Sequence, residues 1–176
     1  MGVIGLKKFL KRADVAVEES IPYGSHLHID ANGWLFEIIN SAKGLAIQRQ
    51  YGGSYTVFDN LIRNSYNDLV IAGFTMTFYF DGSDSLMKKA TRTERNSKRA
   101  ERWMAVYLAT LCEDAKLDQS NLDLPPLTTQ QFIFTLMSLG VSMVHCNFEA
   151  DQTIAIACME AAESSTRPCY CYGNDT

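Results

Sequence analysis

Short apolar runs alternate with longer amphipathic stretches along the chain. Four short runs bounded by turn residues are typical of strands: 26–29, 74–80, 141–146 and 168–172. Apolar residues at helical spacing predict helices over 1–12, 31–46, 56–72 and 85–112. Two more helices are predicted: one is capped by Thr128 or Thr129 and ends at Gly140, and the other runs from Glu149 to Glu163. Because apolar strands alternate with helices, we expect an α/β fold with a mostly parallel central sheet and helices on both faces.

The same pattern predicts buried side chains and helix ends. On the helix over 31–46 the residues expected to face the core are Trp34, Leu35, Ile38, Ile39 and Ala42. On the helix over 56–72 they are Val57, Leu61, Tyr66, Leu69 and Val70. Gly73 is expected to close a helix, and Gly82 to allow a sharp turn after a strand. Trp103 is expected in the core, with stacking on a nucleic-acid base as the alternative.

Composition narrows the class of protein. The chain has 176 residues, 47% of them hydrophobic, which suits one globular domain with its own core. No apolar run approaches the roughly 20 residues that a membrane-spanning helix needs. The cysteines are odd in number and lack CxxC spacing: Cys112, Cys146, Cys158, Cys169 and Cys171. We interpret them as reduced, buried thiols of an intracellular protein rather than a disulfide framework or a zinc site, and the three histidines as strand residues rather than ligands.

Charge is unevenly distributed. Between Lys88 and Arg102 there are seven basic and two acidic residues, which gives this segment a charge of +5. Because the net charge of the whole chain is −4, the remaining residues together carry −9. The basic residues fall at helical spacing and form one stripe: Lys88, Arg92, Arg95, Arg99 and Arg102. An acidic body with one basic helix suggests binding to nucleic acid, and a solvated helix face is the alternative.

Acidic residues follow the predicted strands. Asp30, Asp81 and Asp175 each come after one strand, and Glu149 and Asp151 follow another where a helix begins. Because the carboxyl ends of parallel strands meet at one edge of a sheet, we expect these carboxylates to lie together. A hard divalent cation such as Mg²⁺ or Mn²⁺ prefers oxygen ligands and would relieve their repulsion. Alternatively, the acids only suit the turns and the helix dipole.

Several short segments, in their order along the chain, resemble the flap-endonuclease (XPG-type) nuclease family with its PIN-like fold. They are MGVIGL at 1–6, IDAN at 29–32, FDG at 80–82 and EAD at 149–151. The segment YGGSY at 51–55, followed by FDG and by KKAT at 88–91, is similar to the Asteroid-like branch. The resemblance covers essentially the whole chain, so we expect 1–176 to form a single nuclease domain of the XPG N-terminal/internal type.

The resemblance implies a structure-specific nuclease that hydrolyses phosphodiester bonds of branched or overhanging DNA with two Mg²⁺ (or Mn²⁺) ions. The implied metal ligands are Asp30, Asp81, Glu149, Asp151 and Asp175. The implied catalytic groups are Lys88 and Arg95 on an arch-type helix and the backbone of Gly2 after loss of Met1. The residues expected to contact nucleic acid are Lys88, Lys89, Arg92, Arg95, Arg99 and Arg102.

The expected partner is DNA with single-strand/duplex junctions, with RNA left open, no membrane, and a nuclear location. The family's last acidic motif carries a second Asp two residues after the first, whereas the sequence ends at Thr176, one residue short. We therefore expect a fragment truncated before the helical segment that grips duplex DNA. The second hypothesis is an inactive scaffold or nucleic-acid-binding module with the nuclease fold.

Overall fold

The structure, a computed structural model, describes residues 20–41, 53–83, 89–111, 125–164 and 168–173. The predicted helix over 1–12 lies outside these ranges, as do Gly2, Ala42, Lys88, Cys112 and Asp175. The chain divides into two compact units. The first comprises residues 1–37, 66–82 and 141–176, and the second comprises 38–65 and 83–140.

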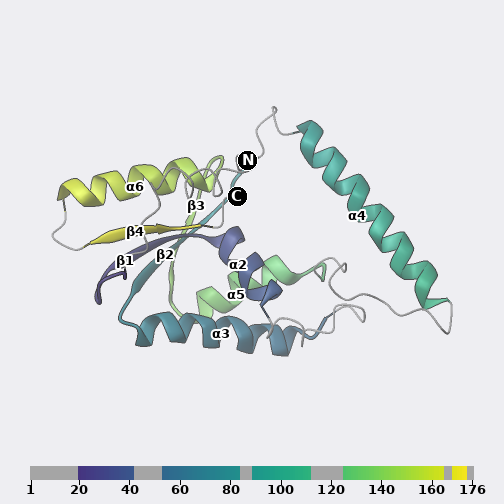
Figure 1. Cartoon of the computed structure of the whole chain (residues 1–176), viewed down its shortest axis with the longest axis horizontal. Helices are drawn as coiled ribbons and strands as arrows, with labels where there is room; N and C mark the ends of the chain where they lie inside the picture. The colour runs from purple at the N-terminus through teal and green to yellow at the C-terminus, as the bar shows by residue number, and fades with distance from the viewer. Residues whose placement is uncertain (1–19, 42–52, 84–88, 112–124, 165–167, 174–176) are drawn as a thin grey trace. The chain divides into compact units, whose positions relative to one another are not determined.

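The first unit contains a four-stranded parallel sheet (Figure 1). Its strands are β1 (His26–Asp30), β2 (Thr75–Phe80), β3 (Ser142–His145) and β4 (Cys169–Tyr172). They lie in the order β3-β2-β1-β4, so β1 pairs with β2 on one side and β4 on the other. The four predicted strands are confirmed, each within a residue or two of its expected ends.

Helices cover both faces of this sheet, as predicted. Trp34 of α2 (Ala31–Asn40) packs edge-on against Phe78 of β2, with ring centroids 5.0 Å apart. On the opposite face, α6 (Ala150–Ser164) buries Ile154 in a cluster with Tyr79 and Cys146. Because side chains of a strand alternate between faces, neighbouring residues such as Phe78 and Tyr79 meet different helices.

The buried face of α3 (Tyr55–Ile71) differs from the predicted one. The buried residues are Phe58, Leu61 and Ile62, whereas Val57 and Val70 are 36% and 45% exposed. Leu61 is buried as predicted, and Tyr66 and Leu69 are half-buried, so only part of the predicted face is confirmed. On α2 the prediction was right, since Trp34, Leu35, Ile38 and Ile39 are all buried. That helix ends at Asn40 rather than at 46.

In the second unit a hydrogen-bonded carboxylate joins α3 to α5 (Thr128–Ser138). Asp59 accepts from Arg63 Nε at 2.7 Å, from the fully buried Thr135 hydroxyl at 2.6 Å and from Gln131 Nε2 at 3.3 Å. Burial alone would raise the pKa of Asp59, but these hydrogen bonds and the charge of Arg63 together lower it. The carboxylate therefore stabilises the pairing of the two helices in its ionised form.

The start of α5 corrects another expectation. Thr128 is its first helical residue rather than its cap, and the Thr128 hydroxyl donates to the Pro125 carbonyl at 2.7 Å. Leu127 occupies the cap position without a side-chain hydrogen bond. At the other end, Gly140 follows the helix with φ of 67°, the left-handed conformation expected of a closing glycine.

The long basic helix, α4 (Lys89–Thr110), is confirmed as a helix in the second unit. The described apolar side chains in its carboxyl-terminal half are exposed, including Trp103 at 41% and Tyr107 at 60%, so the prediction of a buried Trp103 is wrong. Among the described residues, no helix combines the length and the apolar character needed to cross a membrane.

We predict that Asp59→Asn destabilises the protein by about 1–3 kcal/mol at neutral pH, because it replaces a charged acceptor of three hydrogen bonds, one of them from the buried Thr135 hydroxyl. A carboxyl with a lowered folded-state pKa contributes stability above its unfolded-state pKa and loses that contribution as the pH falls through the folded-state pKa. The difference in melting temperature between the two proteins should therefore shrink under acid conditions. Asp68→Asn, at an exposed position of the same helix, is the matched control and should change little. An equal loss in both variants would contradict the role of Asp59.

Candidate metal site at the carboxyl edge of the sheet

The first unit brings four of the predicted acids to one edge of the sheet. Asp30 is the last residue of β1, and Asp81 directly follows β2. The strand β3 leads to Glu149 and then to Asp151, in the first turn of α6. Because all four strands run in parallel, these positions follow carboxyl ends on the same side of the sheet.

Asn32 connects the first two acids. Its backbone N–H donates to Asp30 Oδ1 at 3.0 Å, and its side-chain Nδ2 donates to Asp81 Oδ2 at 3.0 Å. The two carboxylates therefore share one neutral donor residue, which holds them near each other and partly offsets their repulsion. Asn32 belongs to the IDAN segment at 29–32, but the sequence analysis predicted no contact for its side chain.

Asp81 also contacts the start of α6. The backbone N–H of Ala150 donates to Asp81 Oδ1 at 2.8 Å, so a carboxylate from β2 satisfies one of the open N–H groups of the helix. The positive end of the helix dipole lies at this position and favours the carboxylate. Glu149 and Asp151 flank Ala150 in sequence, so this hydrogen bond fixes the start of α6 close to Asp81.

Asp30 and Asp151 line the same open pocket, of about 250 Å³. Ile154 and Ala155 of α6 and the end of β4 form the remaining walls. The residue opposite Asp30 at this edge is Gly173, where an added Cβ would lie 3.8 Å from the Asp30 Cβ, an ordinary contact. Two carboxylates therefore line the pocket, which is open enough to admit solvent or a ligand.

Gly82 is required for close packing rather than for the sharp turn expected from the sequence. It is not among the described glycines with positive φ. Its N–H donates to the Phe148 carbonyl at 2.6 Å, and a Cβ at this position would lie 1.9 Å from the Cys146 carbonyl oxygen. The segment after β2 thus lies directly against the segment that carries Glu149.

The donor set suits a hard divalent cation, since it consists of carboxylate oxygens. Among the described residues, however, no three carboxylates have oxygens within 4.8 Å of one another. Binding of a cation by three of them would thus require the acids to move closer together. The one described group that meets this spacing is His28, Cys158 and Cys169, on the α6-covered face of the sheet.

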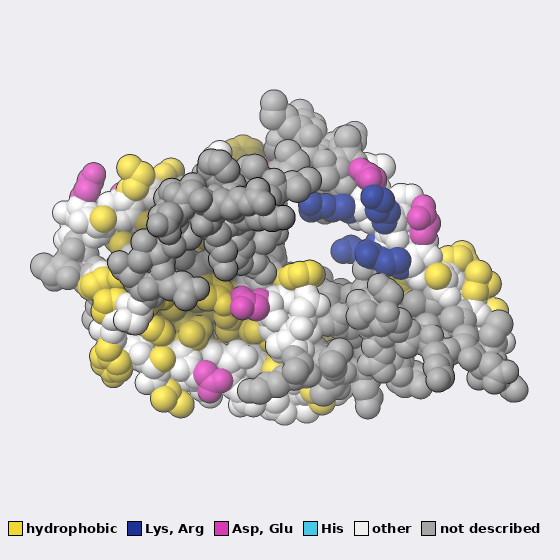
Figure 2. All heavy atoms as spheres, in the orientation of Figure 1, with side chains coloured by type: hydrophobic (Ala, Val, Ile, Leu, Met, Phe, Trp, Pro, Cys, Tyr) yellow, Lys and Arg dark blue, Asp and Glu magenta, His cyan; other side chains and the backbone are white. Residues whose placement is uncertain are grey.

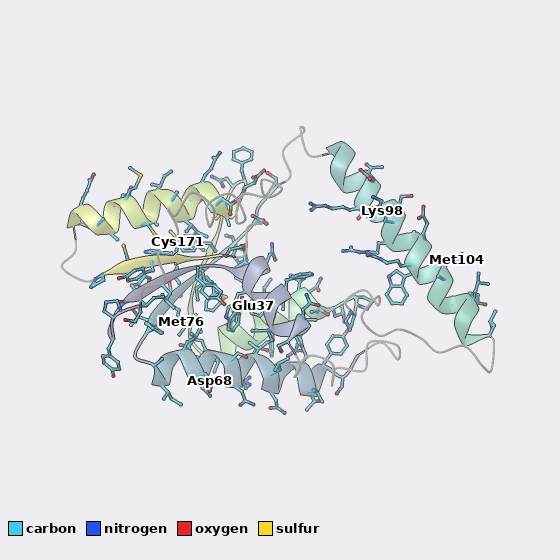
Figure 3. The ribbon with its side chains drawn as sticks, viewed as in Figure 1. Glu37, Asp68, Met76, Lys98, Met104 and Cys171 are labelled. Atoms are coloured by element: carbon cyan, nitrogen blue, oxygen red, sulfur yellow. The ribbon has the colours of Figure 1, made fainter. Side chains whose placement is uncertain are left out.

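Three of the predicted nucleic-acid contacts are described in full on α4. Arg95, Arg99 and Arg102 are exposed and fall at i, i+4 and i+7, so they share one helix face. Figure 2 shows a group of basic side chains, in dark blue, on this helix. On the neighbouring face Lys98 forms an exposed 2.7 Å ion pair with Glu94, and its hydrogen bond lowers the pKa of Glu94 (Figure 3). For Lys89 and Arg92 the structure gives the helical backbone only.

Comparison with known proteins identifies the family. The XPG N-terminal domain matches residues 1–102, more than half of the chain. The chain belongs to this family. No curated protein matches the sequence.

A solved structure of the catalytic core of Rad2 in complex with DNA substrate shares the fold at a TM-score of 0.50, and a second such structure is similar to the chain. One has 14% sequence identity and a TM-score of 0.50 and covers 90% of this chain; another has 16% identity, a TM-score of 0.46 and covers 76%. The chain spans 41% and 36% of the length of those two structures. The fold is therefore the α/β, PIN-like fold that the sequence resemblance implied.

We predict that Gly82→Ala destabilises the protein by at least about 1–3 kcal/mol, because the new methyl group would displace backbone rather than a flexible side chain. Thermal or denaturant unfolding measures the loss. Gly173→Ala, at the same edge and without a close contact, is the control and should remain near the parent stability. If Gly82→Ala were as stable as the control, the packing of this segment against residues 146–148 would be wrong.

Proposed function

We propose that this chain is the amino-terminal part of a metal-dependent, structure-specific nuclease of the XPG type, and that it cleaves phosphodiester bonds of branched or overhanging DNA. The observation that carries the proposal is the joining of Asp30, Asp81 and the start of α6 through Asn32 and the Ala150 N–H. Membership of the XPG N-terminal domain family supports the reaction class.

In this proposal Asp30, Asp81, Glu149 and Asp151 hold two Mg²⁺ or Mn²⁺ ions, with Asp175 as a further ligand. Bound metal ions of this kind activate water and stabilise the leaving oxygen of a phosphoryl displacement. Asn32 keeps Asp30 and Asp81 oriented, and the Ala150 N–H holds Asp81 in place. Ile154, which is buried, gives the pocket an apolar wall.

The basic helix α4 would supply contacts to the substrate. Lys88 and Arg95 are the residues proposed to act on the scissile phosphate, and the backbone of Gly2 is proposed to lie near it. Lys89, Arg92, Arg99 and Arg102 would bind flanking phosphates, which position a nucleic acid without reading its sequence. The Rad2 structures were determined with DNA substrate, which supports DNA as the partner. We propose DNA with single-strand/duplex junctions from the sequence resemblance, and RNA is the other candidate.

The finer assignments follow from the sequence resemblance. We propose the Asteroid-like branch from the YGGSY segment at 51–55, one nuclease domain over 1–176, and action in the nucleus. An inactive scaffold or binding module is the second candidate. The observation in its favour is that the described carboxylates are not within mutual ligand distance.

Metal binding at the acidic edge can be measured by thermal unfolding. Mg²⁺ or Mn²⁺ should raise the melting temperature, because a ligand that binds only the folded state stabilises it by mass action. The double variant Asp81→Asn with Asp151→Asn should lose this gain. The control, Glu160→Gln with Glu163→Gln, removes the same charge from exposed positions of α6 and should keep it. An unchanged metal response in the first variant would place the binding elsewhere.

The role of α4 can be separated into binding and rate in a chain extended beyond Thr176. Arg92→Ala with Arg99→Ala should weaken binding and flatten the slope of log K against log salt by about 0.7–0.9 per lost phosphate contact. Lys88→Ala with Arg95→Ala should slow cleavage more than it weakens binding. If both pairs lost affinity equally and neither showed a separate loss of rate, α4 would be an electrostatic guide only, and the scaffold function would be favoured.

A further inference from the structure

A histidine and two cysteines from three separate elements converge beneath α6. A ring nitrogen of His28 on β1 and the sulfurs of Cys158 on α6 and Cys169 on β4 all lie within 4.8 Å of one another. The register brings them together, because β1 and β4 pair with His26 opposite Cys169 and His28 opposite Cys171. All these strand residues therefore point to the face that α6 covers.

His28 has a buried nitrogen without a partner. The residue is only 7% exposed, and its Nδ1 lies 2.8 Å from the Tyr79 hydroxyl. Its Nε2 is the one buried side-chain nitrogen or oxygen among the described residues that has no hydrogen-bond partner. An unsatisfied buried polar atom is costly and calls for an explanation such as a bound ion.

The neighbouring His26 shows what a satisfied histidine looks like on the same strand. Its Nδ1 lies 2.7 Å from the Thr75 hydroxyl and its Nε2 lies 3.1 Å from the Thr77 hydroxyl. Both ring nitrogens of His26 therefore have partners from β2, whereas only one of His28 does. The nitrogen of His28 that has no hydrogen-bond partner is Nε2.

The thiols are close to one another as well. Cys158 Sγ is 2.9 Å from Cys171 Sγ, and the Cys169 thiol donates to the Cys158 carbonyl at 3.5 Å. Cys158 and Cys169 are half-buried, whereas Cys171 is exposed and lies on β4 beside α6 (Figure 3). The prediction of uniformly buried thiols is therefore wrong, and the exposed Cys171 provides an entry path from solvent.

We propose that His28, Cys158, Cys169 and Cys171 form a binding site for a thiophilic transition metal, Zn²⁺ in the first instance. Four ligands of this kind match the tetrahedral Cys₃His set of structural zinc sites. Zinc–ligand bonds of about 2.3 Å to sulfur and 2.0–2.1 Å to nitrogen place neighbouring ligand atoms about 3.6–3.8 Å apart. The ligand atoms of His28, Cys158 and Cys169 lie within 4.8 Å of one another, so these three require only small side-chain rotations. Cys171, whose Sγ lies 2.9 Å from Cys158 Sγ, is proposed as the fourth ligand.

The chemistry of binding is a proton exchange. Without metal the Cys158 thiol is protonated at neutral pH, because burial and the hydrogen bond with Cys171 raise its pKa to about 12. On binding, three S–H bonds are replaced by three metal–sulfur bonds, and the protons pass to the buffer. When the Nδ1–H of His28 donates to the Tyr79 hydroxyl, the lone pair of Nε2 is available to bind the metal. The hydrogen bond to Tyr79 also fixes the orientation of the imidazole ring.

This site is distinct from the carboxylate site in ligand type. Thiolates and imidazole select zinc and related metals, whereas carboxylates select Mg²⁺ and Mn²⁺. Zinc would link β1, β4 and the middle of α6, and so stabilise the helix whose start contacts Asp81. The inference does not rest on nuclease activity, since zinc binding here would hold for an enzyme or a scaffold.

The test uses the whole 176-residue chain, reduced and freed of metal, titrated with Co²⁺ as a spectroscopic probe for Zn²⁺. We expect one equivalent of Co²⁺ to give thiolate-to-cobalt charge-transfer absorption and the intense visible bands of a tetrahedral ion, both displaced by Zn²⁺. Cys158→Ser and Cys169→Ser should each weaken binding by at least about tenfold. Cys171→Ser should lose about one third of the charge-transfer intensity, as one of three thiolates.

Two controls isolate the site. Cys146→Ser alters a buried thiol in the same apolar cluster as Cys158 and should keep the full signal. Asp81→Asn with Asp151→Asn should also keep it, so a failure of the carboxylate site and a failure of this one are distinguishable. X-ray absorption of the zinc-loaded parent protein, which needs no variant, should show three sulfur ligands and one imidazole.

Three results would overturn the proposal. One is the absence of thiolate-to-cobalt absorption in the parent protein. Another is a full signal in the Cys158→Ser and Cys169→Ser double variant. The last is a Cys158–Cys171 disulfide that persists in protein prepared with reductant, since it would remove two of the ligands.

Discussion

The parallel pairing of β1 with β2 and β4 is the constraint on which both candidate sites depend. Its register places Asp30 opposite Tyr79 and next to the end of β4, and His28 opposite Thr77 and Cys171. A shift by one residue would turn His28 toward the α2 face and exchange it for an apolar side chain. The fully buried Ile29 and Phe78, which are register partners, oppose such a shift because it would replace Ile29 beside Phe78 with a polar histidine.

The local pattern of apolar and polar residues was sufficient to predict the helices and strands. It did not predict which side chains of different elements contact one another. The short apolar runs predicted all four strands, and the strand-end acids predicted the edge where Asp30 and Asp81 meet. The bridging role of Asn32 depends on a residue 49 positions away, which no local pattern encodes. Likewise, Gly82 suggested a turn, whereas the structure requires a glycine there because another segment's backbone approaches it.

The histidine and cysteine cluster was missed for the same reason. Zinc sites are recognised in sequence by pairs of ligands two to four residues apart. Here His28 is separated from Cys158 and Cys169 by more than a hundred residues, and the packing of α6 on the sheet brings them together. One sheet therefore carries oxygen donors beyond its carboxyl edge and sulfur and nitrogen donors on its α6 face, two sets that prefer different metals.

The central claim is that the carboxylates beyond β1, β2 and β3 are a divalent-metal site. The most direct measurement is anomalous diffraction from crystals of the chain soaked in Mn²⁺. We expect anomalous density among the carboxylates of Asp30, Asp81 and Asp151, with these oxygens drawn within bonding distance of the ion. Well-ordered carboxylates without density between them, at Mn²⁺ concentrations that occupy other sites, would contradict it.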